Sequence, residues 1–156
     1  MSDLSTLQVR QGVVRDAQAC ADILNAWIDE TPWMPRVHSH QDVVRHYSEL
    51  VLVKRHVLMA CSSGGEVEGF AALDCDDSFV TALYVAADAR NKGVGGQLLD
   101  ATKKMMSQRV SLWTFIANHR ARRFYAREGF FEVRRTNGDN EEKLPDVLLT
   151  WEGEKQ

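Results

Sequence analysis

Residues 83–99 have the sequence LYVAADARNKGVGGQLL, which is the most informative stretch of the chain. An apolar segment leads into a loop with three glycines, and the loop opens directly into an amphipathic helical pattern. The first turn of a helix has unpaired N–H groups and a partial positive charge, so it attracts phosphate. The glycines let the backbone approach a pyrophosphate with no Cβ in the way, while Arg90 and Lys92 supply charge. The stretch therefore predicts a phosphate-binding turn.

Two well-known phosphate-binding patterns do not fit this turn. A P-loop needs Gly-Lys-Ser/Thr after its spacer residues, whereas here Lys92 precedes Gly93. The dinucleotide fingerprint needs a third glycine three places after the second, but that place after Gly95 holds Leu98, and the upstream segments predict antiparallel strands. What remains is Arg-x-x-Gly-x-Gly, starting at Arg90. Taken alone, a glycine turn before an ordinary helix explains this pattern equally well.

A second motif follows along the chain. Residues 115–130 have the sequence FIANHRARRFYAREGF, which contains Asn-x-x-Ala-x-x-Phe-Tyr-x-x-x-Gly-Phe from Asn118 to Phe130. Together the two motifs resemble those of the GNAT superfamily of acyl-CoA-dependent N-acetyltransferases, in which the first motif binds pyrophosphate. Order, spacing and flanking strands agree, and the resemblance covers roughly residues 67–133.

Length and composition predict one domain over residues 1–156. The resemblance implies an α/β (α+β) GNAT fold, with a mixed, mostly antiparallel twisted sheet of six to seven strands, a parallel central pair and about four flanking helices. Apolar alternation predicts strands at 7–14, 56–62, 67–74, 79–86, 110–117, 130–136 and 147–151. Helical periodicity predicts helices at 16–30, from an N-cap at Ser39 to 54, from the end of loop 88–96 to about 108, and at 118–128. The inner face of the third helix is expected to hold Val94, Leu98, Ala101 and Met105.

The resemblance implies acetyl-CoA as co-substrate and suggests its contacts. Backbone groups of Leu83, Tyr84 and Val85 would pair with the amide-bearing pantetheine arm, although their side chains suit a plain core role equally well. The pyrophosphate would be held by Arg90, Asn91, Lys92, Gly93, Val94, Gly95 and Gly96. Asn118 starts its helix and serves as N-cap, as cofactor contact, or as both.

Tyr125 lies seven residues after Asn118, two helical turns along roughly the same face. By resemblance it is the catalytic acid that meets the departing thiolate. A thiol with a pKa of about 8.5 is a stronger acid than a phenol near 10, so full proton transfer is uphill by about 2 kcal/mol. We therefore expect Tyr125 to stabilise the thiolate by a strong hydrogen bond, with the proton arriving from the attacking amine. The alternative is a core tyrosine beside Phe124.

The sequence leaves the general base open. Some relatives place a glutamate in the strand before the asparagine, but Trp113 or Thr114 stands there in this chain. The remaining candidates are three carboxylates and three imidazoles: Glu68, Asp74, Asp76, His38, His40 and His119. Each carboxylate is also explained as a solvated surface group. The histidines at 38, 40 and 46 have no cysteine nearby, so we expect no metal.

The expected reaction moves an acetyl group from acetyl-CoA to a primary amine of a small molecule or peptide, by direct attack in a ternary complex. By analogy, Trp33, Met34 and Pro35 cover the acceptor pocket and favour an apolar or aromatic substrate part, unless they form a plain hydrophobic patch. An acidic loop attracts a cationic amine or is simply solvated: Asp139, Glu141, Glu142 and Asp146. The alternative function is a non-catalytic acyl-CoA-binding regulatory module.

Charge and cysteine content limit the partners. Nineteen Lys and Arg against 22 Asp and Glu give a net charge of −3, which argues against nucleic acid and anionic membranes. Arg120, Arg122 and Arg123 suit coenzyme A phosphate or water, since no aromatic platform for nucleic acid accompanies them. With no membrane-length apolar run and no visible secretory signal, we expect a cytoplasmic protein, and the resemblance leaves a homodimer open. Three separated cysteines favour reduced thiols over a disulfide framework: Cys20, Cys61 and Cys75.

Overall fold

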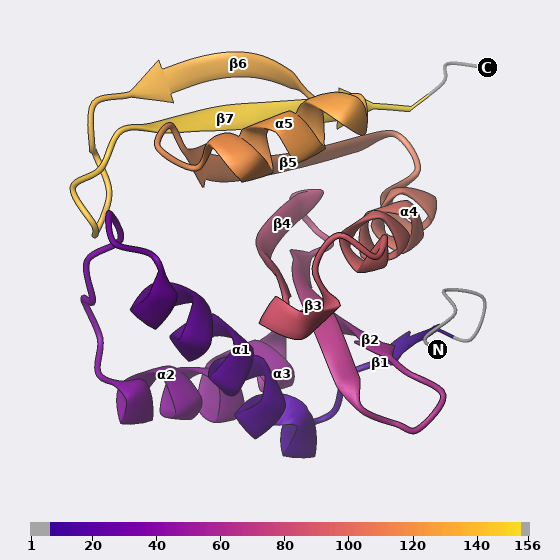
Figure 1. Ribbon diagram of the computed structural model, residues 1–156. Coiled ribbons are helices and arrows are strands. Elements are labelled where there is room, and N and C mark those ends of the chain that lie inside the picture. Colours follow the sequence, from indigo (N-terminus) through magenta and orange to yellow (C-terminus); the bar gives the residue numbers. More distant parts are fainter. Residues whose placement is uncertain (1–6, 154–156) are drawn as a thin grey trace.

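The structure is a computed structural model that describes residues 7–153, so residues 1–6 and 154–156 of the expected domain lie outside it. Seven strands form one sheet in the order β1-β2-β3-β4-β5-β7-β6 (Figure 1). The strands are β1 Gln8–Gln11, β2 His56–Cys61, β3 Val67–Asp74, β4 Phe79–Val85, β5 Arg109–Phe115, β6 Phe131–Thr136 and β7 Asp146–Glu152. The helices are α1 Ala17–Glu30, α2 His40–His46, the π-helix η3 Tyr47–Val51, α3 Leu52–Lys54, α4 Val94–Met106 and α5 His119–Arg127, with short 3₁₀ turns η2 Val14–Asp16 and η4 Ala87–Ala89.

The strands β4 and β5 are the parallel pair near the centre of the sheet. Within residues 7–153 they pair at one position, Phe79 with Ser111, where the Ser111 N–H also donates to the Ser78 carbonyl at 2.9 Å. The other neighbouring strands are antiparallel. A crossover through α4 joins β4 to β5, and parallel strands require such a crossover. The predicted mixed sheet with a parallel central pair is confirmed.

Helices cover both faces of the sheet, so its central strands are buried on both sides. Alternate residues of β2 and β3 enter two separate cores, because strand side chains alternate between faces. On one face, the fully buried Met59 and Phe70 pack with α1, α2 and η3. On the other face, the fully buried Leu73 packs with Leu98 of α4. Figure 1 shows α1 and α2 on one side of β3 and α4 on the other.

One element boundary and the regularity of one helix differ from the prediction. The helix α4 begins at Val94 rather than after Gly96, because Gly93 takes the left-handed conformation, with φ +83°, and turns the chain into the helix. Ser39 caps its helix as predicted, its Oγ accepting from the Asp42 N–H at 3.1 Å. That helix then widens into η3, and such π segments are frequent at functional sites.

The predicted inner face of α4 is wrong at one position. Met105 is 45% exposed in the last turn of the helix. Thr102 is fully buried instead, and its hydroxyl donates to the Leu98 carbonyl at 2.8 Å, which removes the cost of burying it. The first strand is also shorter than predicted, since β1 ends at Gln11 and η2 follows.

Candidate functional site

A cleft of about 600 Å³, called the central cleft below, opens between β4, the first turn of α4 and α5. Every predicted site residue except Lys92 lines it: Leu83, Tyr84, Val85, Arg90, Asn91, Gly93, Val94, Gly95, Gly96, Asn118 and Tyr125. Lys92 is exposed and lies outside this lining. Trp27, Arg127 and Glu128 line the cleft without having been predicted. Arg127 could have been predicted from the sequence, because it lies three residues after Phe124 and so on the same side of the helix. Trp27 could not, because it comes from α1, which is distant in the sequence.

Glycines shape the floor of the central cleft. A Cβ added to Gly95 would lie 3.3 Å from the Phe124 ring, and one added to Gly96 would lie 3.1 Å from the Glu128 carboxylate. The backbone of α4 therefore lies close to side chains of α5, and a larger residue at either glycine would require these side chains to shift by a few tenths of an ångström. The N–H groups of this first helical turn have no partners within the helix and carry partial positive charge. This arrangement suits a pyrophosphate.

The charged residues of the turn are engaged with neighbours. The Arg90 Nε donates to the Val85 carbonyl at 3.3 Å, and its guanidinium forms an ion pair with Glu30 of α1. Arg120 donates to the Asn91 side-chain oxygen at 2.7 Å, linking the start of α5 to the turn. These contacts hold two arginines at the rim, where an anion would meet them.

The β4 edge at Leu83–Val85 is open on its β5 side. Leu83 pairs with Ala71 and Val85 with Gly69 of β3. On the other side, the described chain has no strand partner beyond Phe79. Strand-edge N–H and C=O groups without a partner strand are available to an extended amide-bearing ligand.

Asn118 caps α5, its side-chain oxygen accepting from the Ala121 N–H at 3.1 Å. The capping half of its predicted role is thus observed. Because Asn118 also lines the central cleft, its amide nitrogen is available to a ligand, and the cofactor contact stays a prediction.

Tyr125 is buried in the wall of the central cleft. Its ring packs against those of Phe124 and Phe130, with centroids 5.1 and 5.4 Å away. Burial, and secondly the nearby Tyr84, raise the pKa of its phenol. Among residues 7–153 no group hydrogen-bonds this hydroxyl, and no fully buried side-chain oxygen lacks a partner, so the hydroxyl faces the cleft. A protonated donor therefore borders the space next to the β4 edge.

The sequence of residues 53–132 matches the family described as the Acetyltransferase (GNAT) domain. The chain belongs to the GNAT acetyltransferase family. The match covers β4, the glycine turn, α4 and α5, which are the elements around the central cleft. Acyl transfer is therefore the general activity of this N-acetyltransferase. No curated protein matches the sequence.

Solved structures share the fold of this acetyltransferase at low sequence identity. Apo YjaB from Escherichia coli is 19% identical, with a TM-score of 0.77 over 95% of this chain and 99% of that one. YncA from Salmonella typhimurium, solved with its cofactor acetyl-CoA, is 18% identical, with a TM-score of 0.71 over 97% and 96%. A GCN5-related N-acetyltransferase from Kribbella flavida is 15% identical, with a TM-score of 0.74 over 96% and 99%.

None of the six base candidates lines the central cleft of the acetyltransferase. Asp74 pairs with Arg55 at 3.0 Å and lies opposite Phe79 in the sheet. Tyr84 is five residues further along β4, about 16 Å away at the usual rise of a strand. Asp76 is exposed in the following turn, and His119 is exposed at the start of α5.

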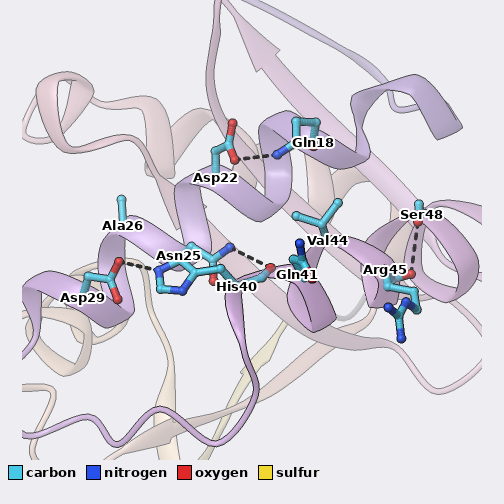
Figure 2. A pocket seen from close by; sticks show the side chains of 10 residues that line it. All are labelled: Gln18, Asp22, Asn25, Ala26, Asp29, His40, Gln41, Val44, Arg45 and Ser48. Atoms are coloured by element: carbon cyan, nitrogen blue, oxygen red, sulfur yellow. Dashed lines mark hydrogen bonds and ion pairs between the residues drawn. The ribbon is translucent and has the colours of Figure 1, made fainter.

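His40 lies in a different cavity, between α1 and α2 (Figure 2). Its Nε2 is 2.7 Å from the Asp29 carboxylate, while the Asn25 amide donates to the His40 carbonyl at 3.3 Å. Gln18 donates to Asp22 at 2.8 Å on the same wall. Figure 2 shows these bonds, of which those of His40 to Asp29 and Asn25 join α2 to α1.

Two negative findings apply to residues 7–153. No three His, Cys, Asp or Glu side chains converge there as metal ligands would. None of the helices in that range is long and apolar enough to cross a membrane.

Proposed function

We propose that the enzyme transfers an acetyl group from acetyl-CoA to a primary amine of a small molecule or peptide, by direct attack in a ternary complex. The observation that carries this proposal is the central cleft, in which the glycine-bordered start of α4, the open β4 edge and the Tyr125 hydroxyl line one continuous space. An elongated molecule with a diphosphate at one end and a thioester at the other fits that sequence of groups.

Each segment then has one task. The N–H groups of the first turn of α4 bind the pyrophosphate, with Arg90 and Arg120 at the rim. The backbone of Leu83–Val85 pairs with the pantetheine arm and so fixes how far the thioester reaches. The Tyr125 hydroxyl donates a hydrogen bond to the sulfur as negative charge develops on it.

The protons balance without a covalent acyl-enzyme. An alkyl ammonium group, with a pKa near 10, first loses one proton to solvent, and about one amine in 1,000 is neutral at pH 7. The neutral nitrogen attacks, the N–C bond forms and the C–S bond breaks. A second N–H proton neutralises the thiolate and yields free coenzyme A thiol. Tyr125 stays protonated throughout, in agreement with its raised pKa.

The compartment proposed is the cytoplasm, where cysteines stay reduced. Cys20, Cys61 and Cys75 are all free thiols in the structure. A homodimer stays open, as the resemblance implied, and no nucleic acid partner is proposed.

Two measurements test the function. Calorimetric titration with coenzyme A should show stoichiometric binding, and acetyl-CoA with amines should release free thiol at a rate that depends on the amine. Absence of coenzyme A binding contradicts the proposal. Binding without thiol release, for any amine of a broad panel, favours a non-catalytic acyl-CoA-binding module instead.

A further inference from the structure

A second cavity of about 630 Å³ lies on the α1 and α2 side of β4. We call it the Tyr47 cavity. Its walls come from segments far apart in the sequence: α1, the loop after it, α2 with η3, β4 and the loop between β6 and β7. Tyr84 lines both this cavity and the central cleft, so the two spaces share this residue in their walls.

Three polar groups are electrostatically coupled across this junction. Tyr84 contributes, after burial, to the raised pKa of Tyr125 on the thioester side. On the other side, burial and then the charge of Glu142 raise the pKa of Tyr84 to about 12. The linings agree with this order, since Glu142 and Tyr84 line the Tyr47 cavity, and Tyr84 and Tyr125 line the central cleft.

Two groups in the Tyr47 cavity have no partner among residues 7–153. Tyr47 is 3% exposed, and its hydroxyl makes no hydrogen bond with a described residue. Since no fully buried side-chain oxygen there is left unsatisfied, this hydroxyl is open to the cavity. Glu142 is half-buried and forms no ion pair with the described chain, whereas neighbouring Glu141 pairs with His38. A half-buried carboxylate and a buried hydroxyl without partners suit a cationic donor.

The remaining lining combines apolar side chains with four carboxylates and three basic side chains, of which His38 pairs with Glu141 and Arg45 lies beside Asp42. Leu24, Ile28, Met34 and Pro35 form the apolar wall. Of the four carboxylates, Asp42 lies 3.6 Å from Arg45 and Glu49 is exposed. A ligand with a positive group and an apolar body matches both kinds of side chain, and a ligand with its own carboxylate is repelled.

We propose that the Tyr47 cavity is the acceptor site and that it takes a primary arylalkylamine. The ammonium group binds Glu142 and the Tyr47 hydroxyl, and the ring packs against the apolar wall. This inference rests on the proposed function, since the amine must reach a thioester beside Tyr125. Deprotonation to solvent then leaves a neutral nitrogen next to Tyr84, where the two spaces meet.

The first experiment compares three amines by acetyl-CoA-dependent release of free thiol. 2-Phenylethylamine has both features, phenylalanine adds a carboxylate to the same ring and amine, and putrescine has ammonium groups without an apolar body. We expect kcat/KM for 2-phenylethylamine to exceed each of the others by at least about ten-fold. Equal use of phenylalanine or putrescine, or no use of 2-phenylethylamine, overturns the inference.

Calorimetry with coenzyme A separates this inference from the proposed function. If coenzyme A binds and other amines are acetylated while 2-phenylethylamine is not, the acceptor class is wrong and the function stands. If coenzyme A does not bind, the function itself fails and the inference fails with it.

A matched pair of variants tests the carboxylate. Glu142→Gln keeps the shape and removes the charge, so KM for 2-phenylethylamine should rise at least about ten-fold, with kcat within about three-fold and an unchanged coenzyme A affinity. Glu66→Gln makes the same change at an exposed position between β2 and β3, outside the cavity, and KM should stay within about two-fold. Equal effects of the two variants, or a KM unaffected by Glu142→Gln, overturn the inference.

Discussion

The central cleft and the Tyr47 cavity share Tyr84 but are built from different material. The central cleft is lined by Trp27 and by two nearly continuous stretches around residues 83–96 and 118–128, and its helical turn offers backbone N–H groups to a ligand. The Tyr47 cavity is lined by residues from several segments between residues 24 and 142. A site made of backbone holds a constant ligand with few demands on residue type. A site made of side chains sets specificity, because each position changes what is bound.

The largest effect should come from the Tyr125→Phe variant. Removing the one hydroxyl that meets the thiolate should lower kcat about 100-fold, since a donor aimed at developing charge contributes that much. Coenzyme A affinity should not change, because the ring still packs against Phe124 and Phe130. Steady-state kinetics and calorimetry measure the two quantities. A kcat within about three-fold of the parent enzyme would remove Tyr125 from the mechanism.

The pH profile should reflect the amine rather than the enzyme. Below the pKa of the amine, kcat/KM should rise about ten-fold per pH unit, because only the neutral nitrogen attacks. The raised pKa of Tyr125 keeps its phenol protonated, so no decline should follow up to about pH 10. Initial rates between about pH 6.5 and 9.5 measure this. A decline below about pH 9 would mean that the Tyr125 phenol ionises, contrary to its burial.

Gly93→Ala should affect the central cleft alone. At φ +83° a Cβ is strained by about 1–2 kcal/mol, which shifts the turn and its N–H groups. Coenzyme A affinity should fall about ten-fold, while KM for the amine at saturating acetyl-CoA stays within about two-fold. Gly64→Ala is the control, since the nearest atom to its added Cβ is 3.9 Å away. Unchanged coenzyme A binding in Gly93→Ala would show that this turn does not hold the diphosphate.

Met34→Ala should affect the Tyr47 cavity alone. Shortening this wall should raise KM for 2-phenylethylamine about five-fold, by the loss of apolar contact, and leave KM for putrescine and coenzyme A affinity unchanged. A parallel loss of coenzyme A affinity would mean that the two sites are not separate in the way the structure indicates.

The smallest effect should come from the anchor of α1, which carries one wall of the Tyr47 cavity. Asp16 accepts from Arg10 at 2.8 and 2.9 Å and from the Val13 N–H at 2.8 Å. The Arg10 bonds, and then the Val13 bond, lower the pKa of Asp16 against the opposing effect of burial. Asp16→Asn should lower the free energy of unfolding by about 1 kcal/mol, a modest loss because Arg10 is partly exposed. It should also raise KM for the amine about two-fold.

The same pair has a defined pH dependence. The pKa of Asp16 is lower in the folded chain than in the unfolded chain. The stability that Asp16 contributes is therefore complete above the pKa of the unfolded state, and is lost as the pH falls through the pKa of the folded state. Thermal unfolding of Asp16→Asn and the parent should therefore differ at neutral pH and converge in acid. A constant difference down to about pH 2 would contradict this assignment.

The sequence was most informative where function depends on neighbouring residues. The stretch from Leu83 to Gly96 predicted the strand, turn and helix of the central cleft because spacing along the chain determines a turn and the helix that follows it. Lys92 lies outside the lining of the central cleft, because charge alone does not determine which way a loop side chain points, and its contact with pyrophosphate stays a prediction. The burial of Thr102 was not predicted, because a hydroxyl that bonds a carbonyl of its own helix is buried as readily as an apolar group.

The Tyr47 cavity could not be predicted in the same way. The acidic loop and Met34 were recognised as acceptor candidates, but the convergence of Tyr47, Tyr84 and Glu142 depends on the packing of α2 and η3 and on a loop near residue 140. No sequence spacing encodes a contact across such separations. The widening at η3, which includes Tyr47, is likewise absent from a regular helical pattern.

Within the described residues, the two halves of the sheet pair at one position, Phe79 with Ser111. A ligand bound in the central cleft would contact β4 and α4 of one half and α5 of the other, and would thereby stabilise the folded chain. Coenzyme A at a hundred times its Kd would add about 2.7 kcal/mol to the free energy of unfolding. If the acyl donor were depleted, the enzyme would lose this stabilisation, unfold more often and be degraded faster by proteases.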